Sequence, residues 1–494
     1  MTKELNWDPV LQPGETCWRL ARSNRFALII DAASYFAHLR AAMIRARRTI
    51  HLVGWDFDTR IRLLPGDGDG EWPNKLGRFI NALVRRRPEL EVRVLKWDIG
   101  VLQSLGRGAT PLFILDWMTS KRVHFRLDHE HPRGACHHQK IAVIDDTLAF
   151  CGGIDLTVGR WDTRAHREDD PCRKSPWGVA QPPWHDATAA VDGEAARVLG
   201  ELARERWKQA TGEDLSPPSP GEEIWPDGLL ATFTNVEVGI ARSRPAYGGQ
   251  PRVREIEALY LQAIRSAREA IYIESQYLAS HRIGRALAER LEEAGGPDVV
   301  ILGPKTAEGW LEEETMGAAR MVVGHRLRRA DRERRLRLLY ATNEDETDIY
   351  VHAKIMIIDD RLLRVGSSNL NNRSMGLDTE CDLAVEARTG APDRDVLRAT
   401  IRAVRNDLLA EHLGVEIRAV EKLAAQGLGP VGIIDALAKP RGRTLHGLPL
   451  PELNAFEEKL AESRIFNTER PEALRRKLTR LAPWSKRTAL LRSD

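Results

Sequence analysis

The stretch HHQKIAVID, residues 137–145, decides how this chain is interpreted, because its pattern occurs a second time. It carries a histidine, a lysine and an aspartate in the spacing H-x-K-x-x-x-x-D, and HAKIMIID, residues 352–359, repeats that spacing. The residues that follow also agree, since GGID at 152–155 corresponds to GSSN at 366–369. Agreement over so long a window is not expected by chance, so the chain contains an internal duplication.

The sequence around the two motifs extends the duplication to whole domains. IRARRTIHLVGWD (44–56) is similar to IRSAREAIYIESQY (264–277), and each has the pattern of a helix end followed by an apolar strand. The proline-rich run SPPSP, residues 216–220, predicts a linker between the copies. We therefore predict one domain over residues 1–215, a second over 216–415, and a helical, basic extension over 416–494.

Short apolar runs alternate with segments of helical periodicity along both copies. This alternation predicts α/β domains in which helices pack on a central sheet. A helix over residues 194–212, with a glycine at its end, is expected to close the first domain. The predicted strands are residues 92–98, 123–128, 141–145, 299–304, 337–340 and 355–359.

Composition sets wide bounds on class and location. A chain of 494 residues is too long for one compact core, and 42% hydrophobic with 29% charged residues is typical of a folded protein. The net charge of +3 favours no particular partner, and five cysteines without a C-x-x-C spacing argue against a disulfide framework or a cysteine-rich zinc site. We find no signal-peptide pattern and no apolar run of about 18 residues. A cytoplasmic protein, at most peripheral on a membrane, is expected.

The motif itself suggests chemistry on phosphate. Side chains two positions apart on a strand face the same way, so the histidine and lysine of each motif should meet one ligand. A neutral imidazole can attack phosphorus or accept a proton, and an ammonium group can hold a phosphate oxygen. The aspartate lies at the far end of the strand and is expected to fix the turn or the packing. The candidate catalytic set consists of the six motif residues, His138, Lys140, Asp145, His352, Lys354 and Asp359.

Two such motifs in one duplicated chain resemble the phospholipase D superfamily, over roughly residues 30–390. Departures at Ser275 and Asp155, where asparagine is expected, remove no reacting group. The resemblance implies two similar α/β domains, each a mixed central sheet flanked by helices, related by a pseudo-twofold axis with one active site between them. Four further stretches are similar to the phosphatidylcholine-type branch: CGGIDLTVGRWD (151–162), PWHDATAAVDGEAA (183–196), IYIESQYL (271–278) and NLNNRSMGLDTE (369–380).

The resemblance also implies a reaction in two steps. One histidine attacks the phosphodiester to form a phosphohistidine, and the other protonates the leaving alcohol and then activates water or an acceptor alcohol. By analogy we take His138 as the nucleophile and His352 as the acid and base, although the sequence leaves the order open. The two lysines should bind the phosphoryl oxygens, and the further binding or orienting candidates are Asp155, Asn369 and Ser367.

Each catalytic histidine needs an acceptor for its second ring nitrogen. We predict Asp186 as the acceptor for His138 and Glu380 as the acceptor for His352, because the resemblance places one carboxylate after each motif. A neighbouring carboxylate raises the pKa of a histidine, which suits a general acid. His137 and His185 are expected either to pack in the core or to support the catalytic residues from behind.

The expected substrate is a glycerophospholipid at a membrane surface, with water or a primary alcohol as acceptor. Two basic segments, residues 320–337 and 473–492, are candidates for contact with that surface. A cardiolipin synthase-like phosphatidyltransferase and a nuclease-type phosphodiesterase are the alternatives, although we expect no dedicated nucleic-acid partner, and we expect a monomer. No metal is required by this chemistry. The acidic run at 343–348 could bind calcium, but a solvated loop is the preferred interpretation.

Overall fold

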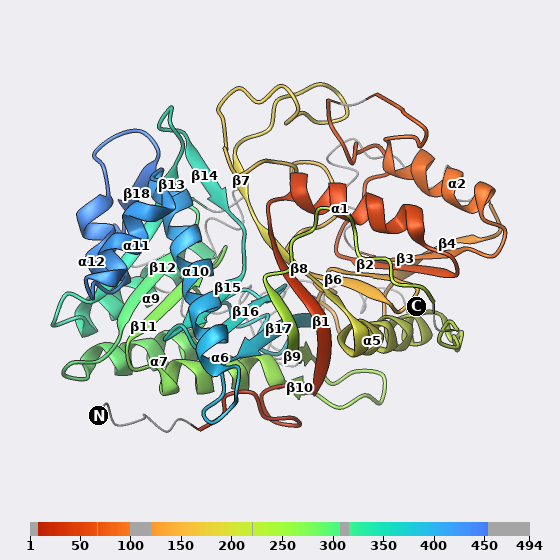
Figure 1. Ribbon diagram of the computed structural model, residues 1–494. Coiled ribbons are helices and arrows are strands. Elements are labelled where there is room, and N and C mark those ends of the chain that lie inside the picture. The colour runs from red at the N-terminus through yellow and green to blue at the C-terminus, as the bar shows by residue number, and fades with distance from the viewer. Residues whose placement is uncertain (1–7, 67, 99–119, 220, 307–315, 453–494) are drawn as a thin grey trace, which may run out of the picture.

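The computed structural model describes residues 8–66, 68–98, 120–219, 221–306 and 316–452 (Figure 1). The first half of the chain forms β1 (Arg19–Ile30), α1 (Ala32–Arg45), β2 (Thr49–Gly54), α2 (Leu76–Arg86), β3 (Glu91–Trp97), β4 (Val123–Asp128), β5 (Ile141–Ile144), β6 (Leu148–Gly152), β7 (Trp184–His185), β8 (Ala187–Asp192) and α5 (Gly193–Thr211).

The second half repeats this plan. It forms β9 (Phe233–Arg244), β10 (Val253–Arg254), α6 (Glu255–Ser266), β11 (Ala270–Glu274), α7 (His281–Glu292), β12 (Asp298–Leu302), α9 (Ala318–Ala330), β13 (Leu336–Thr342), β14 (Asp348–Val351), β15 (Ile355–Ile358), β16 (Leu362–Gly366), β17 (Glu380–Glu386) and α10 (Arg394–Leu413). Three short elements follow, α11 (Ile417–Ala425), α12 (Pro430–Leu437) and β18 (Thr444–Gly447).

Strand pairing joins the two halves into one sheet. In the first half β4, β3 and β2 are parallel neighbours, and β5, β6, β8 and β1 continue the sheet in antiparallel fashion. In the second half β13, β12 and β11 are parallel, followed by antiparallel β15, β16, β17 and β9. β1 pairs with β9 at the centre, from Arg19 opposite Ile240 to Phe26 opposite Phe233. The symmetry of this order confirms two similar mixed sheets related by a pseudo-twofold axis.

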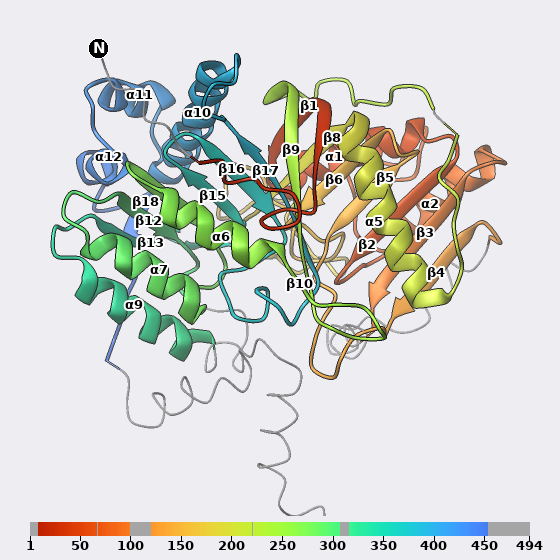
Figure 2. The same ribbon diagram turned by 90° about the horizontal axis from the view of Figure 1, so that it is seen from below.

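Helices cover both faces of each half (Figures 1 and 2). On β5, Ala142 and Ile144 pack in the cluster that contains α1 and α2, whereas Ile141 and Val143 pack in the cluster that contains α5. On β15 the same alternation separates α6, α7 and α9 from α10. Because alternate residues of a strand face opposite ways, each half is a three-layer sandwich. The cluster with α5 and α10 contains strand residues of both halves, so the halves share a core.

The α/β class, all six predicted strands and the helix over 194–212 are confirmed, with ends displaced by at most a few residues. After residue 415 the described chain forms the helices α11 and α12, and it also adds the short strand β18, which pairs with β13. Residues 453–494, including the predicted basic tail, lie outside the described residues. Within the described part of the chain, no helix is both long enough and apolar enough to span a membrane.

Candidate active site

The two motif aspartates act as backbone anchors. The Asp145 carboxylate accepts hydrogen bonds from the backbone N–H groups of Arg47, Arg48 and Thr49, at 2.6–2.8 Å, where β2 begins. Asp359 does the same for residues 268–270 before β11, at 2.7–2.9 Å. Both aspartates adopt left-handed backbone angles, with φ of 51° and 52°. These contacts agree with the expected role of both aspartates in fixing the turn, and the two residues are therefore removed from the candidate catalytic set.

The histidine of each motif lies in an extended segment just before its strand, where the backbone of the opposite half holds it. The N–H of His138 donates to the carbonyl oxygen of Thr379 at 2.9 Å, and the N–H of His352 donates to that of His185 at 2.7 Å. β7 also pairs with β14, the strand that leads into the second motif. Each histidine is thus clamped next to the strand that carries the opposite half's carboxylate.

This arrangement reverses the predicted pairing of histidines and carboxylates. Nδ1 of His138 lies 3.0 Å from an oxygen of Glu380, and Nδ1 of His352 lies 2.6 Å from an oxygen of Asp186. The prediction assigned each carboxylate to the histidine that precedes it in the chain, and it is wrong for both. The physical reason is the backbone clamp, which brings residue 380 beside the first motif and residue 186 beside the second.

The two carboxylates have different surroundings. Ser367 and Ser374 donate hydroxyl hydrogen bonds of 2.6 and 2.7 Å to Glu380, so Ser367 orients this acceptor. Gly153 occupies the position equivalent to Ser367, and a Cβ atom there would lie 2.3 Å from an oxygen of Asp186. The shorter aspartate therefore requires glycine at residue 153, whereas the longer glutamate is held by serine.

The two acceptor residues, Asp186 and Glu380, also differ in their protonation state. Burial raises the pKa of Glu380 to about 8. Burial also opposes ionisation of Asp186, but the contacts with His352 and Lys354 outweigh it and hold the pKa of Asp186 below its usual value. At neutral pH Asp186 is therefore an anion, whereas Glu380 is largely protonated.

The charges of both motif lysines act on His138. Burial, followed by the charges of Lys140 and Lys354, holds the pKa of His138 well below its usual value, so the two lysines approach it from different halves. Burial lowers the pKa of Lys354 to about 7. The ammonium group of Lys140 lies 3.0 Å from Asp155, so Asp155 orients this lysine. Its counterpart Asn369 is buried, with its amide nitrogen 3.5 Å from Gln276.

Two residues that the sequence did not single out line the site beside His352. The Trp184 ring lies 5.0 Å from the imidazole of His352, and the Arg160 guanidinium lies 4.0 Å from the centre of the Trp184 ring. Burial and the charge of Lys354 lower the pKa of His352, and the charge of Arg160 adds to this effect. Asp186 acts in the opposite direction. Arg160 and Trp184 lie in the stretches GRWD and PWHD, whose similarity to the phospholipase D superfamily could have identified them as site residues.

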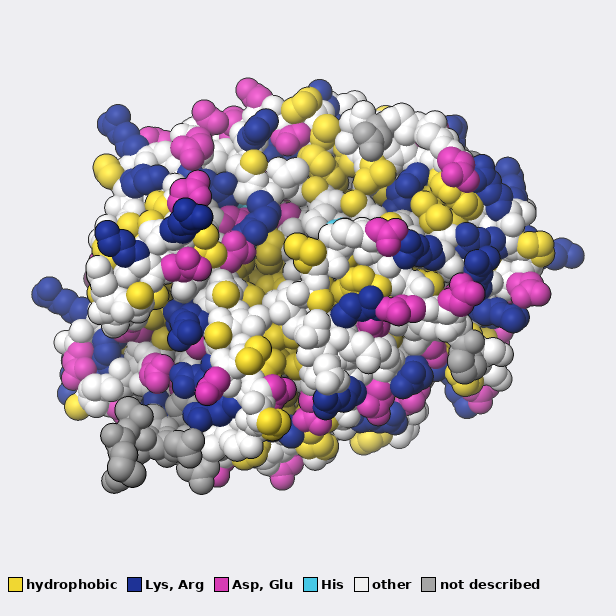
Figure 3. Space-filling view, in the orientation of Figure 1, with side chains coloured by type: hydrophobic (Ala, Val, Ile, Leu, Met, Phe, Trp, Pro, Cys, Tyr) yellow, Lys and Arg dark blue, Asp and Glu magenta, His cyan; other side chains and the backbone are white. Residues whose placement is uncertain are grey.

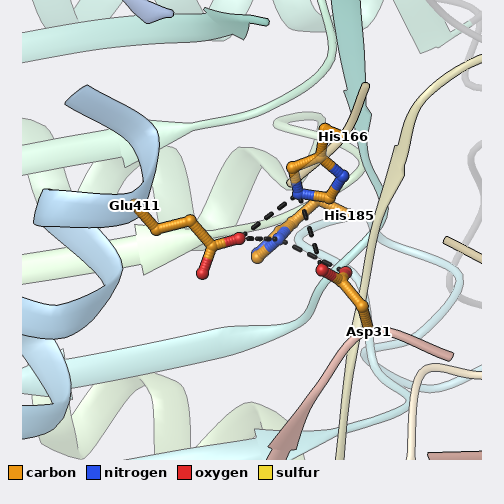
Figure 4. A group of neighbouring side chains, drawn as sticks. All are labelled: Asp31, His166, His185 and Glu411. Atoms are coloured by element: carbon orange, nitrogen blue, oxygen red, sulfur yellow. Dashed lines mark hydrogen bonds and ion pairs between the residues drawn. The ribbon is translucent and has the colours of Figure 1, made fainter. Parts of the chain in front are cut away.

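Beside this site lies a buried group formed by Asp31, His166, His185 and Glu411 (Figure 4). Their four ligand atoms lie within 4.8 Å of one another. His185 precedes the acceptor Asp186 and its carbonyl oxygen accepts the N–H of His352, which agrees with a supporting role behind the catalytic residues. Such a donor set could hold a divalent cation. Burial opposes protonation of both histidines, yet nearby carboxylates outweigh it and raise their pKa values. Burial raises the pKa of Asp31 to about 7, so this carboxyl group is partly protonated at neutral pH.

The remaining predictions fall elsewhere. The acidic run at 343–348 is a turn, in which the Asn343 side chain accepts backbone N–H groups of Asp345 and Thr347. The basic segment at 320–337 is divided between α9 and the start of β13. His137 is buried between Thr379 and Asp128, at 2.9 and 3.0 Å, in agreement with a packing role.

Comparisons with known proteins agree with this duplicated site. A family model described as "Phospholipase D" matches residues 42–219, and one described as "Cardiolipin synthase, PLD-like domain" matches residues 260–396. "Phospholipase D A" of Dictyostelium discoideum is 25% identical over 436 residues, which cover 72% of this chain and 32% of that protein. "Phospholipase D alpha 1" of Carica papaya is 26% identical over 516 residues, which cover 76% of this chain and 63% of that protein.

The chain thus spans between a third and two thirds of the length of these curated relatives. The crystal structure of a phosphatidylserine synthase from Haemophilus influenzae Rd KW20 is similar in fold, with a TM-score of 0.53 at 13% identity, covering 83% of this chain and 94% of that one. The two family matches span more than half of the chain and contain one motif each. The chain therefore belongs to the phospholipase D superfamily.

Proposed function

We propose that this protein is a phosphodiesterase that cleaves glycerophospholipids to phosphatidic acid and a head-group alcohol through a phosphohistidine. The observation that carries the proposal is the pair of imidazoles, each held through Nδ1 by a buried carboxylate of the opposite half. This geometry directs the Nε2 atom of each ring toward substrate. The names of the curated relatives support phospholipids as the substrate class.

In the first step Nε2 of His138 attacks phosphorus, and the bond between phosphorus and the head-group oxygen breaks. The proton on Nε2 of His352 passes to that leaving oxygen. In the second step His352 takes a proton from water or a primary alcohol, whose oxygen attacks phosphorus and breaks the phosphorus–nitrogen bond. Lys140 and Lys354 stabilise the charge on the phosphoryl oxygens in both steps.

The difference between the two carboxylates supports this order of events. An anionic partner stabilises imidazolium, so His352 with Asp186 is the better general acid. Burial and nearby cations lower the pKa of both histidines, but anionic Asp186 opposes this at His352, whereas the acceptor of His138 is a largely protonated Glu380. We therefore assign the nucleophile to His138 and the acid and base to His352.

The test is a vesicle assay with and without ethanol, followed by trapping of the intermediate. Wild type should release head group and form phosphatidylethanol, and His138→Ala should do neither. A His352→Asn variant given phosphatidyl-p-nitrophenol should release about one equivalent of nitrophenol and carry a phosphatidyl adduct on the peptide that contains His138. An adduct on His352 in a His138→Asn variant would reverse the assignment. Absence of lipid turnover by wild type would reject phospholipid as the substrate.

A further inference from the structure

Residues 173–181, here called the finger, form a small rigid hairpin in the long connection between β6 and β7. Its two sides are joined by backbone hydrogen bonds, from the N–H of Gln181 to the carbonyl of Arg173 at 3.0 Å and from that of Ser175 to Val179 at 2.8 Å. The buried Arg173 side chain fixes its base, with one N–H donating to Asp162 and another to the Gln181 carbonyl, both at 2.9 Å. The finger is therefore held in place at its root.

The tip of the finger, residues 176–180 with the sequence PWGVA, is apolar and projects into solvent. All five residues are exposed, and Trp177 and Val179 have exposed fractions of 65% and 61%. Gly178 turns the chain with a left-handed φ of 81°. A rigid scaffold that presents tryptophan and valine to water is unexpected unless the tip contacts something apolar.

A basic pocket of about 360 Å³ lies against one side of the finger. Its lining includes four cationic side chains and, among the described residues, no carboxylate. The four cations are Arg60, Arg62, Lys75 and Lys174. Arg60 is paired with Asp58, but no ion pair engages the other three within the described part of the chain. Such a pocket is suited to an anionic group such as a phosphate.

The other side of the finger leads to the active site. Trp177 and Trp184 both line a second cavity of about 270 Å³, and the Trp184 ring lies 5.0 Å from that of His352. In Figure 3 hydrophobic side chains are grouped near the upper edge of the molecule, where Figure 1 draws the connection between β6 and β7. The apolar tip, the basic pocket and the active site therefore share one side of the protein.

We propose that the finger docks the protein on an anionic phospholipid surface, with the tip in the lipid interface and the basic pocket on a lipid phosphate. Tryptophan prefers the boundary between water and acyl chains, and cations near it are drawn to anionic head groups. A protein partner would need roughly 800 Å² of complementary surface, which a convex tip of five residues does not offer. This inference rests on the proposed function, because docking here would place a lipid head group near His352.

The test compares Val179→Asp and Lys174→Glu with wild type and with the control Val396→Asp, whose valine is 68% exposed on α10. Binding is measured by co-sedimentation with vesicles of phosphatidylcholine alone and of phosphatidylcholine with phosphatidylglycerol. Val179→Asp should weaken binding to both about tenfold or more. Lys174→Glu should weaken binding only to the anionic vesicles, by about 5- to 30-fold. Val396→Asp should bind as wild type does.

A second readout separates docking from chemistry. Turnover of dibutyroylphosphatidylcholine, which is monomeric in water, should be unchanged in Val179→Asp, while turnover of vesicles falls with binding. Wild-type binding that is unaffected by both finger variants would overturn the docking proposal while leaving the proposed function intact. Vesicle binding that depends on the finger, without turnover of either substrate, would support docking and reject the proposed function.

Discussion

Nδ1 of His352 lies 2.6 Å from a carboxylate oxygen of Asp186, although the two residues belong to different halves of the chain. The reciprocal contact joins His138 to Glu380 at 3.0 Å. Neither half therefore contains a complete histidine–carboxylate pair. The crossed contacts make the two motifs chemically distinct, because one acceptor is an aspartate held near glycine and the other a glutamate held by two serines.

The first prediction concerns the roles of the two acceptors. Asp186→Asn should lower kcat for natural phospholipids by about 10²- to 10⁴-fold, because an uncharged partner stabilises the His352 imidazolium poorly. With phosphatidyl-p-nitrophenol, whose leaving group needs little protonation, the initial burst of nitrophenol should be nearly normal. Glu380→Gln alters the acceptor of His138, the proposed nucleophile. It should therefore slow the initial release of the leaving group from natural phospholipids and from phosphatidyl-p-nitrophenol alike. Equal burst defects in the two variants would contradict the assignment.

A second prediction tests the glycine beside Asp186. Gly153→Ser should lower kcat by about tenfold or more, because a Cβ atom there would lie 2.3 Å from the Asp186 carboxylate and would displace it from His352. Adding Asp186→Glu to this variant reproduces the serine and glutamate of the other half and should restore part of the activity. If Gly153→Ser alone retains full kcat, the close approach does not constrain the acceptor.

A third prediction concerns stability. Asp359→Asn should lower the free energy of unfolding by about 2–4 kcal/mol, because an amide offers three backbone N–H donors a weaker, single acceptor oxygen. Asparagine tolerates the left-handed backbone of this position, so the loss reports the hydrogen bonds. Chemical denaturation measures it, with exposed Asp393→Asn as control. The folded variant should keep most of its kcat, and a loss comparable to that of His352→Ala would indicate a catalytic role.

The fourth prediction is the pH dependence of stability that arises from Glu380. Its pKa is about 8 in the folded protein and about 4.5 in an unfolded chain. Between pH 4.5 and pH 8 the folded protein therefore keeps the Glu380 proton, whereas the unfolded chain has lost it. The contribution of this proton to the free energy of unfolding is full below pH 4.5, falls as pH rises, and is lost above pH 8. Between pH 5 and 8 wild type should lose on the order of 4 kcal/mol relative to Glu380→Gln. Denaturation curves that stay parallel across this range would contradict the raised pKa.

The duplicated motifs carried most of what the sequence could predict. Apolar runs such as 141–145 and 355–359 have the composition of buried strands, and the repeat implied two similar halves around one site. The central strands β1 and β9 were missed because arginine, serine and asparagine interrupt their apolar residues. Packing between the halves stabilises these strands, and that contact has no local signature.

The partner of each histidine could not be predicted for a related reason. Asp186 and Glu380 occupy equivalent positions in the repeat, so the sequence identifies both as acceptors without saying which ring each one meets. That choice depends on the docking of residues 185 and 379 against the opposite motif. Likewise, the neighbourhood of Asp31 and Glu411 joins two residues from opposite ends of the described chain.

The crossed pairs also bear on the moment at which this protein becomes active during its synthesis. A nascent chain that has folded its first half already presents His138 and Lys140, but Glu380 has yet to leave the ribosome. His352 and its partner can likewise meet only when both halves have docked. A chain that ends before the second half therefore lacks a complete pair of histidine and carboxylate.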